Sequence, residues 1–206
     1  ANKYLKKKPY FKEIQNRLGW YYQQILKLTF VLKFTKDKRA PIIIWDADTI
    51  ILKKILFFEK KNSICHGTTS EFHKAYYLTN RALLNTLPKY FISSLCQFSS
   101  ITVLEADFLI KKLKKIKSKN KNIGEWITGV IFKAITSAHQ KYNGSMFSEY
   151  ELIGQSNLLK NNNKQKLISG IREHLNGKLS IFQKNIIIYL GYSYVAYEHT
   201  HPNKNS

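Results

Sequence analysis

Residues 42–52, IIIWDADTIIL, place two carboxylates at the end of an apolar, β-branched run. An unbroken run of this kind is typical of a strand that is buried on both faces of a mostly parallel sheet. Two carboxylates about 5 Å apart repel each other by roughly 3 kcal/mol at an effective dielectric constant of 20. We therefore expect a positive group between Asp46 and Asp48. The carboxyl end of a strand is also where open α/β sheets bind their ligands.

Asp46-Ala47-Asp48 is a candidate metal site. Carboxylates separated by one residue can reach the same divalent cation, and Mg²⁺ or Mn²⁺ is commonly held by one or two carboxylates together with phosphate oxygens. Such a cation would neutralise a diphosphate leaving group. The alternative is that the two aspartates are an accidental acidic pair in a loop.

The rest of the chain alternates between helical and strand patterns. Residues 20–35 have the periodicity of an amphipathic helix, and Pro41 disfavours its continuation. Thr68 and Glu71 have the spacing of a capping box, which predicts a helix from there to about Leu87. Further helices are predicted at 105–121, 124–138 and 147–159, and a second buried strand at 97–104. After the polar loop 160–166, the sequence predicts a short helix followed by a segment of strand character at 181–197.

This alternation predicts the α/β class, with a mostly parallel central sheet flanked by helices. With 206 residues and 44% hydrophobic content, the chain can bury one sizeable core. We expect a single domain over residues 1–206, with a core at about 19–160 and a C-terminal extension at 161–206.

The formal net charge is +21, and 30 of the 34 basic residues are lysine. Arginine is the preferred residue for reading bases and clamping phosphates. The lysine excess, with abundant Asn, Ile and Tyr, fits an AT-rich genome as well as an anionic partner, namely a membrane surface, a phosphate-bearing ligand or RNA. The basic stretch 105–121 has the pattern of either a solvated helix face or a face apposed to a membrane.

The spacing of the cysteines and the length of the apolar stretches indicate the cellular compartment. Cys65 and Cys96 are far apart and fit neither a disulfide framework nor a zinc motif, so a reducing environment is expected. No apolar stretch reaches the roughly 18 residues that span a bilayer. We expect a cytoplasmic protein, with peripheral contact to the inner face of the membrane as an option.

Glu149 is a candidate catalytic base. Ser148 and Glu151 have the spacing of a capping box, which gives Glu151 a structural role at the helix start. Glu149 would lie in the first helical turn and has no such structural role. A carboxylate there could orient or deprotonate an acceptor hydroxyl, or it could simply complement the helix dipole.

His199 is a candidate metal ligand. His199 and His201 could lie on one face of an extended tail, and a terminal histidine can complete a metal shell; a disordered tail is the alternative. Nucleophile–histidine, Walker and dinucleotide-binding motifs are missing from the sequence.

Four stretches in this order, GWYYQQILKL, IIIWDADTIILKKILFF, SSITVLEADFLIKKL and FSEYELIG, resemble bacterial proteins related to DXD-containing glycosyltransferases of the GT-A fold. The similarity runs from about Gly19 to Gly154. It implies a transferase in which Asp46 and Asp48 hold Mn²⁺ or Mg²⁺ against a nucleotide-sugar diphosphate and Glu149 serves as base. It also implies that Gln23 and Gln24 are packing or donor-side polar residues.

The resemblance has one gap. Residues 1–18 are too short and too basic to form the nucleoside-binding βαβ unit that precedes the DXD strand in such enzymes, so we expect an N-terminally shortened domain. The acceptor would be a cell-surface glycan or a lipid-linked molecule, with the lysine-rich 111–121 stretch held against an anionic membrane.

Two other functions stay open at this stage. A basic RNA-associated or assembly protein on an α/β scaffold would bind RNA with a steep salt dependence. A haloacid-dehalogenase-like phosphatase also begins with a strand ending in D-x-D and would form an aspartyl-phosphate at Asp46. However, the chain has only four Asp and no adjacent acidic pair for the second half of such a site.

Overall fold

The computed structural model describes residues 11–59, 61–68, 72–86, 95–116, 122–139, 145–162, 166–173 and 179–197. The helices are α2 (Phe11–Asn16), α3 (Leu18–Lys38), α4 (Lys74–Leu84), α5 (Val103–Leu113), α6 (Ile123–Ala138), α7 (Glu149–Lys160) and α8 (Ile181–Tyr189). The strands are β1 (Ile42–Trp45), β2 (Thr49–Ile51), β3 (Phe58–Glu59), β4 (Asn62–Ser63), β5 (Cys65–Thr68), β6 (Leu95–Ile101), β7 (Lys166–Glu173) and β8 (Tyr194–Tyr197). The predicted α/β class is therefore confirmed.

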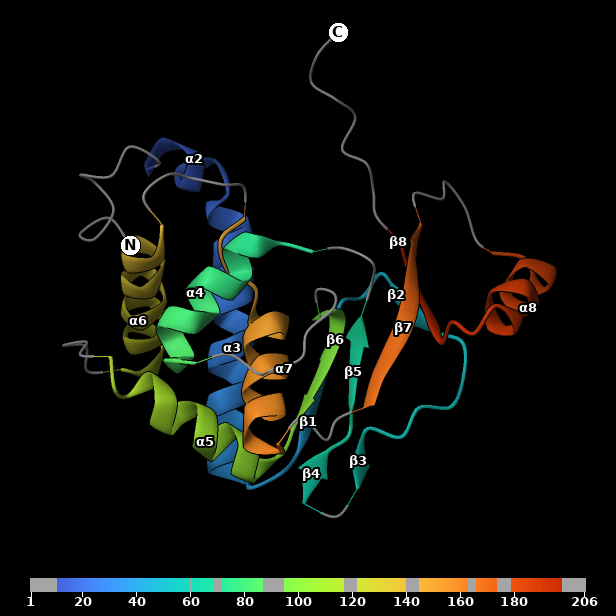
Figure 1. The fold of residues 1–206 in the computed structure, drawn as a ribbon, viewed down its shortest axis with the longest axis horizontal. Helices are drawn as coiled ribbons and strands as arrows, with labels where there is room; N and C mark the ends of the chain where they lie inside the picture. Colours follow the sequence, from blue (N-terminus) through green and yellow to red (C-terminus); the bar gives the residue numbers. More distant parts are fainter. Residues whose placement is uncertain are drawn as a thin grey trace, which may run out of the picture.

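Helices α2 to α7 gather on one side of the sheet, and α8 lies alone beyond its other side (Figure 1). The largest cluster of buried apolar side chains lies within the helical group, where α3, α5, α6 and α7 contribute residues such as Leu28, Leu109, Ile131 and Leu152. Two smaller clusters, one around Phe98 and one around Ile187, fill the sheet and the base of α8.

The main sheet is mixed, which corrects the prediction of a mostly parallel sheet. Its order is β1-β6-β5-β7-β8-β2, with parallel pairing at β5–β7 and β7–β8 and antiparallel pairing elsewhere. β7 and β8, from the segment beyond residue 160, lie inside this order. The two edge strands, β1 and β2, are joined directly by Asp46-Ala47-Asp48, so the sheet is nearly closed.

β1 is an edge strand and not the doubly buried central strand that the sequence predicts. Ile42 and Ile44 pack against the helical cluster, whereas Trp45 is 46% exposed and stacks on Phe57. An apolar β-branched run fits an edge strand covered on one face just as well as a central one, and the sequence does not distinguish them.

The predicted helix at 68–87 starts later than its supposed capping box. Thr68 belongs to β5, and α4 begins after His73, which makes no side-chain capping hydrogen bond; Glu71 lies outside the described residues. A complete capping box exists instead at Thr102 and Glu105, so α5 begins at Val103. α5 ends at Leu113, well before the predicted Lys121, and residues 117–121 lie outside the described part.

Of the two predictions for the C-terminal tail, the short helix is wrong and the strand character at 181–197 is confirmed only at Tyr194–Tyr197. The segment taken as a short helix is β7, and its parallel pairing with β5 and β8 involves partners distant in sequence. The segment of strand character contains α8, because Ser180 and Gln183 form a capping box there, and only Tyr194–Tyr197 is a strand. Residue Gly170 of β7 has to be a glycine, because a Cβ added there would lie 2.2 Å from the Tyr194 ring.

Candidate functional site

The Asp46-Ala47-Asp48 segment forms a tight turn between β1 and β2. The Thr49 amide donates a hydrogen bond to the Asp46 carbonyl at 3.0 Å, and the Tyr197 amide of β8 donates to the Asp48 carbonyl at 3.0 Å. The turn is thus closed by its own hydrogen bond and tied to β8. The side chain of Asp46 is partly exposed and Asp48 is exposed, so solvent reaches both residues.

The positive group beside Asp46 is Lys27 of α3. Its Nζ lies 2.9 Å from Asp46 Oδ1 and 2.5 Å from Glu149 Oε1. It also lies 4.4 Å from the centre of the Tyr150 ring, a cation–π distance. Burial alone would lower the pKa of Lys27, but the charges of Glu149 and Asp46 together raise it above its usual value. Lys27 therefore stays charged and links two acidic residues that are distant in sequence.

Glu149 is the first residue of α7 and its side chain has no exposed surface. Burial raises the pKa of Glu149 to about 7, against the opposing effect of Lys27. Its Oε2 has no hydrogen-bond partner in the described part of the chain. A buried carboxyl group that titrates near neutral pH is matched to proton transfer, which is a property of catalytic acids and bases.

Tyr150 connects the turn to α7. Its hydroxyl donates a hydrogen bond to Asp46 Oδ1 at 3.1 Å and accepts one from Lys27 Nζ at 3.3 Å. Burial, followed by the charges of Asp46, Glu149 and Asp48, raises the pKa of Tyr150 well above its usual value. The phenol therefore remains protonated, and the contribution of Asp48 shows that this carboxylate also belongs to the same electrostatic cluster.

Gln24 is buried one helical turn before Lys27, and its Oε1 accepts a hydrogen bond from the Glu149 amide at 3.4 Å. Ser148 caps α7, because its Oγ accepts from the Glu151 amide. The carboxylate of Glu151 instead accepts a hydrogen bond from Gln155 Nε2 at 3.1 Å. These contacts fix the start of α7, and with it Glu149, against α3.

A second buried polar network holds α7 against the sheet. Asn157 Nδ2 donates to the Ser100 carbonyl at 2.7 Å and to Ser63 Oγ at 3.1 Å. Glu105 accepts from the amide and hydroxyl of Ser63 and from the amide of Thr102. A buried hydrogen-bond network loses free energy when one of its bonds is missing. The network therefore favours a single arrangement of α5, α7, β4 and β6, which carry its residues.

The structure brings together three of the predicted site residues, Asp46, Glu149 and Gln24, and places Asp48 next to them. Gln23, the neighbour of Gln24, is exposed on α3. His199 lies outside the described residues.

Sequence reasoning missed Lys27 and Tyr150. Lys27 could have been found, since it shares a helix face with the buried Gln24, Leu28 and Val31, and a lysine in a buried stripe needs an acidic partner.

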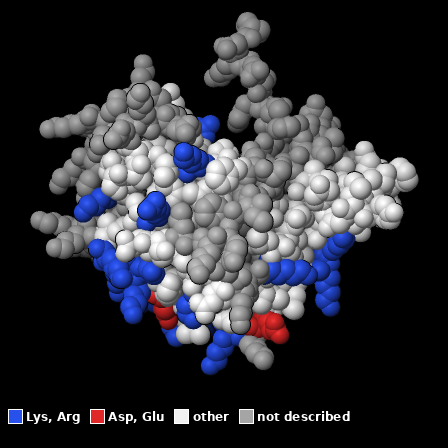
Figure 2. All heavy atoms as spheres, in the orientation of Figure 1, with Lys and Arg blue, Asp and Glu red and all other residues white. Residues whose placement is uncertain are grey.

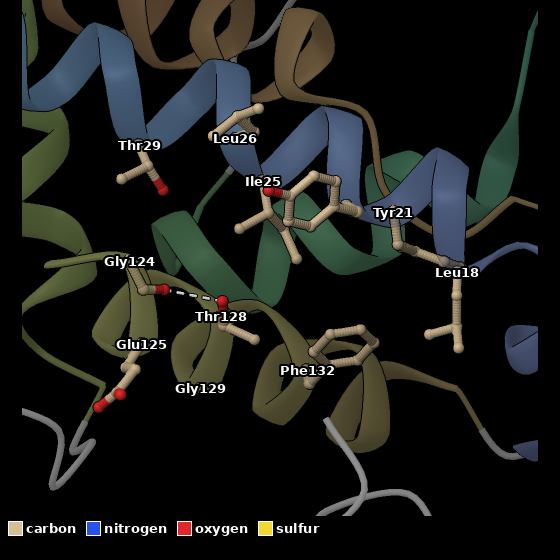
Figure 3. Close-up of a pocket in the computed structure, with 11 residues that line it drawn as sticks. Leu18, Tyr21, Ile25, Leu26, Thr29, Gly124, Glu125, Thr128, Gly129 and Phe132 are labelled. Carbon is tan, nitrogen blue, oxygen red and sulfur yellow. Dashed lines mark hydrogen bonds between the residues drawn. The ribbon is translucent and has the colours of Figure 1, made fainter. Parts of the chain in front are cut away.

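A separate apolar hollow of about 460 Å³ lies between α3 and α6. Figure 3 shows Leu18, Tyr21 and Ile25 from α3 facing Thr128 and Phe132 from α6 across it. Neither Lys27, Asp46 nor Glu149 lines this hollow. We therefore place the candidate chemistry at the polar cluster and not in this apolar hollow.

The residues at the turn fit a cation that is shared with a phosphate ligand. Within the described residues, no group of three or more His, Cys, Asp or Glu side chains is arranged to hold a metal ion by itself. Asp46 and Asp48 supply two carboxylates, which is the usual protein share for Mg²⁺ or Mn²⁺ bound together with phosphates.

Comparisons with models of known protein families, with curated proteins and with solved structures found no match. In the described part of the chain, no helix is both long enough and apolar enough to cross a bilayer.

Proposed function

We propose that the chain is a metal-dependent glycosyltransferase domain, which transfers a sugar from a nucleotide-sugar donor to a cell-surface glycan or a lipid-linked acceptor. The observation that carries the proposal is the convergence of Asp46, Lys27 and Glu149 from three separate elements. The resemblance of the sequence to DXD-containing transferases adds to it.

Asp46 and Asp48 would hold the cation at the sheet edge, where both residues are accessible to solvent. Mn²⁺ or Mg²⁺ bound there would neutralise the departing diphosphate. Lys27 carries a positive charge beside the same turn and would interact with phosphate oxygens on the protein side. Tyr150 orients Asp46 through its hydroxyl hydrogen bond.

Glu149 would accept the proton of the acceptor hydroxyl as the sugar anomeric carbon passes from the diphosphate oxygen to the acceptor oxygen. Its pKa of about 7 allows it to take up a proton near neutral pH. In the structure Lys27 lies between Glu149 and the turn. Because the Glu149 side chain is fully buried, this role requires that Lys27 move from Glu149 to the donor phosphates and that the start of α7 open the carboxylate to the acceptor.

A thermal-shift screen with nucleoside diphosphates and nucleotide sugars, with and without Mn²⁺, tests the proposal. We expect stabilisation by one nucleotide class that depends on Mn²⁺ and disappears in Asp46→Asn/Asp48→Asn. The matched control is Asp37→Asn, which removes an exposed aspartate at the end of α3, away from the turn. Stabilisation that survives in the double variant, or none with any nucleotide, would contradict the proposal.

A further inference from the structure

Helix α8 has several large apolar side chains that are exposed to solvent. Ile181, Phe182 and Tyr189 are 78%, 73% and 90% exposed, and Ile186 and the adjoining Leu190 are also exposed. At about 100° per residue these five side chains cover roughly half of the helix circumference. Asn185 is the polar residue within this arc. An exposed face with this many large apolar side chains marks an interaction site.

The helix is well formed despite this exposure. Ser180 and Gln183 make a reciprocal capping box at its start. At its end, Gly191 adopts a φ of +95°, and the Tyr192 amide donates to the Ile187 carbonyl at 3.2 Å. A nine-residue helix is marginal in water by itself, so these caps and its attachment to the sheet keep it folded.

The attachment uses only one side of α8. Ile187 is the one residue of the helix that is buried, and it packs in a cluster with Leu179 and Val195. Leu52, just beyond β2, lies against the same cluster. The sheet therefore holds α8 from one side and presents its apolar face outward, as Figure 1 shows by the position of α8 outside all other elements.

Lysine residues occur on α8 and directly after Leu52, which packs against the buried side of α8. Segments 49–57 and 179–197 contain Lys53, Lys54 and Lys184 and no acidic residue. In Figure 2 the lobe around α8 is white, with blue atoms below it and no red atoms on it. An apolar helix face with basic neighbours matches the chemistry of an anionic bilayer, whose headgroups attract lysine and whose acyl region accepts apolar side chains.

We propose that α8 inserts its outward face into the interfacial region of an anionic lipid membrane. Phe182 and Tyr189 would enter the boundary between headgroups and acyl chains, where aromatic side chains are favoured. Lys53, Lys54 and Lys184 would contact lipid phosphates. This surface differs from the lysine-rich 111–121 stretch and stands whether or not the chain is a glycosyltransferase.

Co-sedimentation of the full chain with vesicles tests this inference, comparing phosphatidylcholine alone with phosphatidylcholine plus phosphatidylglycerol. We expect binding to the anionic vesicles. Phe182→Ser/Tyr189→Ser should weaken it more than tenfold, because each large apolar side chain contributes about a factor of ten or more on full burial. Lys53→Gln/Lys54→Gln should weaken it roughly fivefold per lysine.

The matched control is Tyr22→Ser/Phe30→Ser, which removes two exposed aromatic residues from α3. All four substituted aromatic side chains are more than half exposed, and a thermal melt of each variant checks that its fold is intact. Equal vesicle binding by the α8 variant and the wild type, or no binding by the wild type, would overturn the inference. A wild-type dimer in solution that the α8 variant alone abolishes, without vesicle binding, would instead assign the face to self-association.

Discussion

Replacing Glu149 by glutamine should change how the stability of the protein depends on pH. The side chain is fully buried, and its pKa in the folded state is about 7, compared with 4.5 for the free group. The folded state therefore binds more protons than the unfolded state between these two values. Because stability falls with rising pH wherever the folded state binds more protons, Glu149 should destabilise the fold progressively from pH 4.5 to pH 7.

The size of this effect follows from the shift. Each pKa unit corresponds to about 1.4 kcal/mol, so a shift from 4.5 to about 7 amounts to about 3 kcal/mol. Glutamine has nearly the same shape and does not titrate. The difference in unfolding free energy between Glu149→Gln and the wild type should therefore grow by about 3 kcal/mol in favour of the variant between pH 4.5 and pH 8.

The assay is urea unfolding followed by circular dichroism at intervals over this pH range. Burial lowers the pKa of His139, which contributes a slope of the opposite sign, but this contribution is common to both proteins and cancels in their difference. Glu59→Gln, on an exposed carboxylate of β3, is the control and should follow the wild-type curve. Parallel curves for Glu149→Gln and wild type would refute the assignment of a proton to the buried carboxyl group.

The remaining predictions concern the ion pair, the sheet and α8. Lys27→Met leaves Glu149 buried without its counter-charge, so it should cost about 3 kcal/mol at pH 8 and clearly less at pH 5, where Glu149 is protonated; urea unfolding at both pH values checks this. Gly170→Ala forces a Cβ into the Tyr194 ring and should cost about 1–3 kcal/mol or more in the same assay, whereas Gly19→Ala, in open space, should cost nothing. Ser180→Ala removes the cap of α8 and should increase amide hydrogen exchange in residues 181–189 by roughly fivefold, corresponding to about 1 kcal/mol, without changing exchange in α7.

The sequence predicts best those elements whose signals are local. The periodicity of α3 and α6, the apolar run of β1 and the start of α7 after Ser148 were all visible in short windows. The place of β1 in the sheet was not visible, because it depends on β6, more than fifty residues away. For the same reason the tail was misassigned, since β7 gains its strand conformation from pairing with β5 and β8.

The candidate site also combines features that the local sequence predicts with features that depend on contacts between distant segments. Like-charge repulsion predicts a positive group between Asp46 and Asp48, and the structure places Lys27 next to Asp46. That this same lysine also contacts Glu149 depends on the packing of α3 against α7, which no local pattern contains. The caps of α5 and α8 were present in the sequence as Thr102 with Glu105 and Ser180 with Gln183, and a search for that spacing would have found both.

The most direct measurement is a double-mutant cycle on nucleotide binding, with the nucleoside diphosphate from the screen titrated calorimetrically in the presence of Mn²⁺ into wild type, Asp46→Asn, Asp48→Asn and the double variant. If both carboxylates hold one cation against the diphosphate, each single substitution should abolish most of the binding and the double substitution should add little. Chelation of Mn²⁺ should reduce the wild type to the level of the variants. Independent, additive losses, or undiminished binding in the variants, would contradict the account.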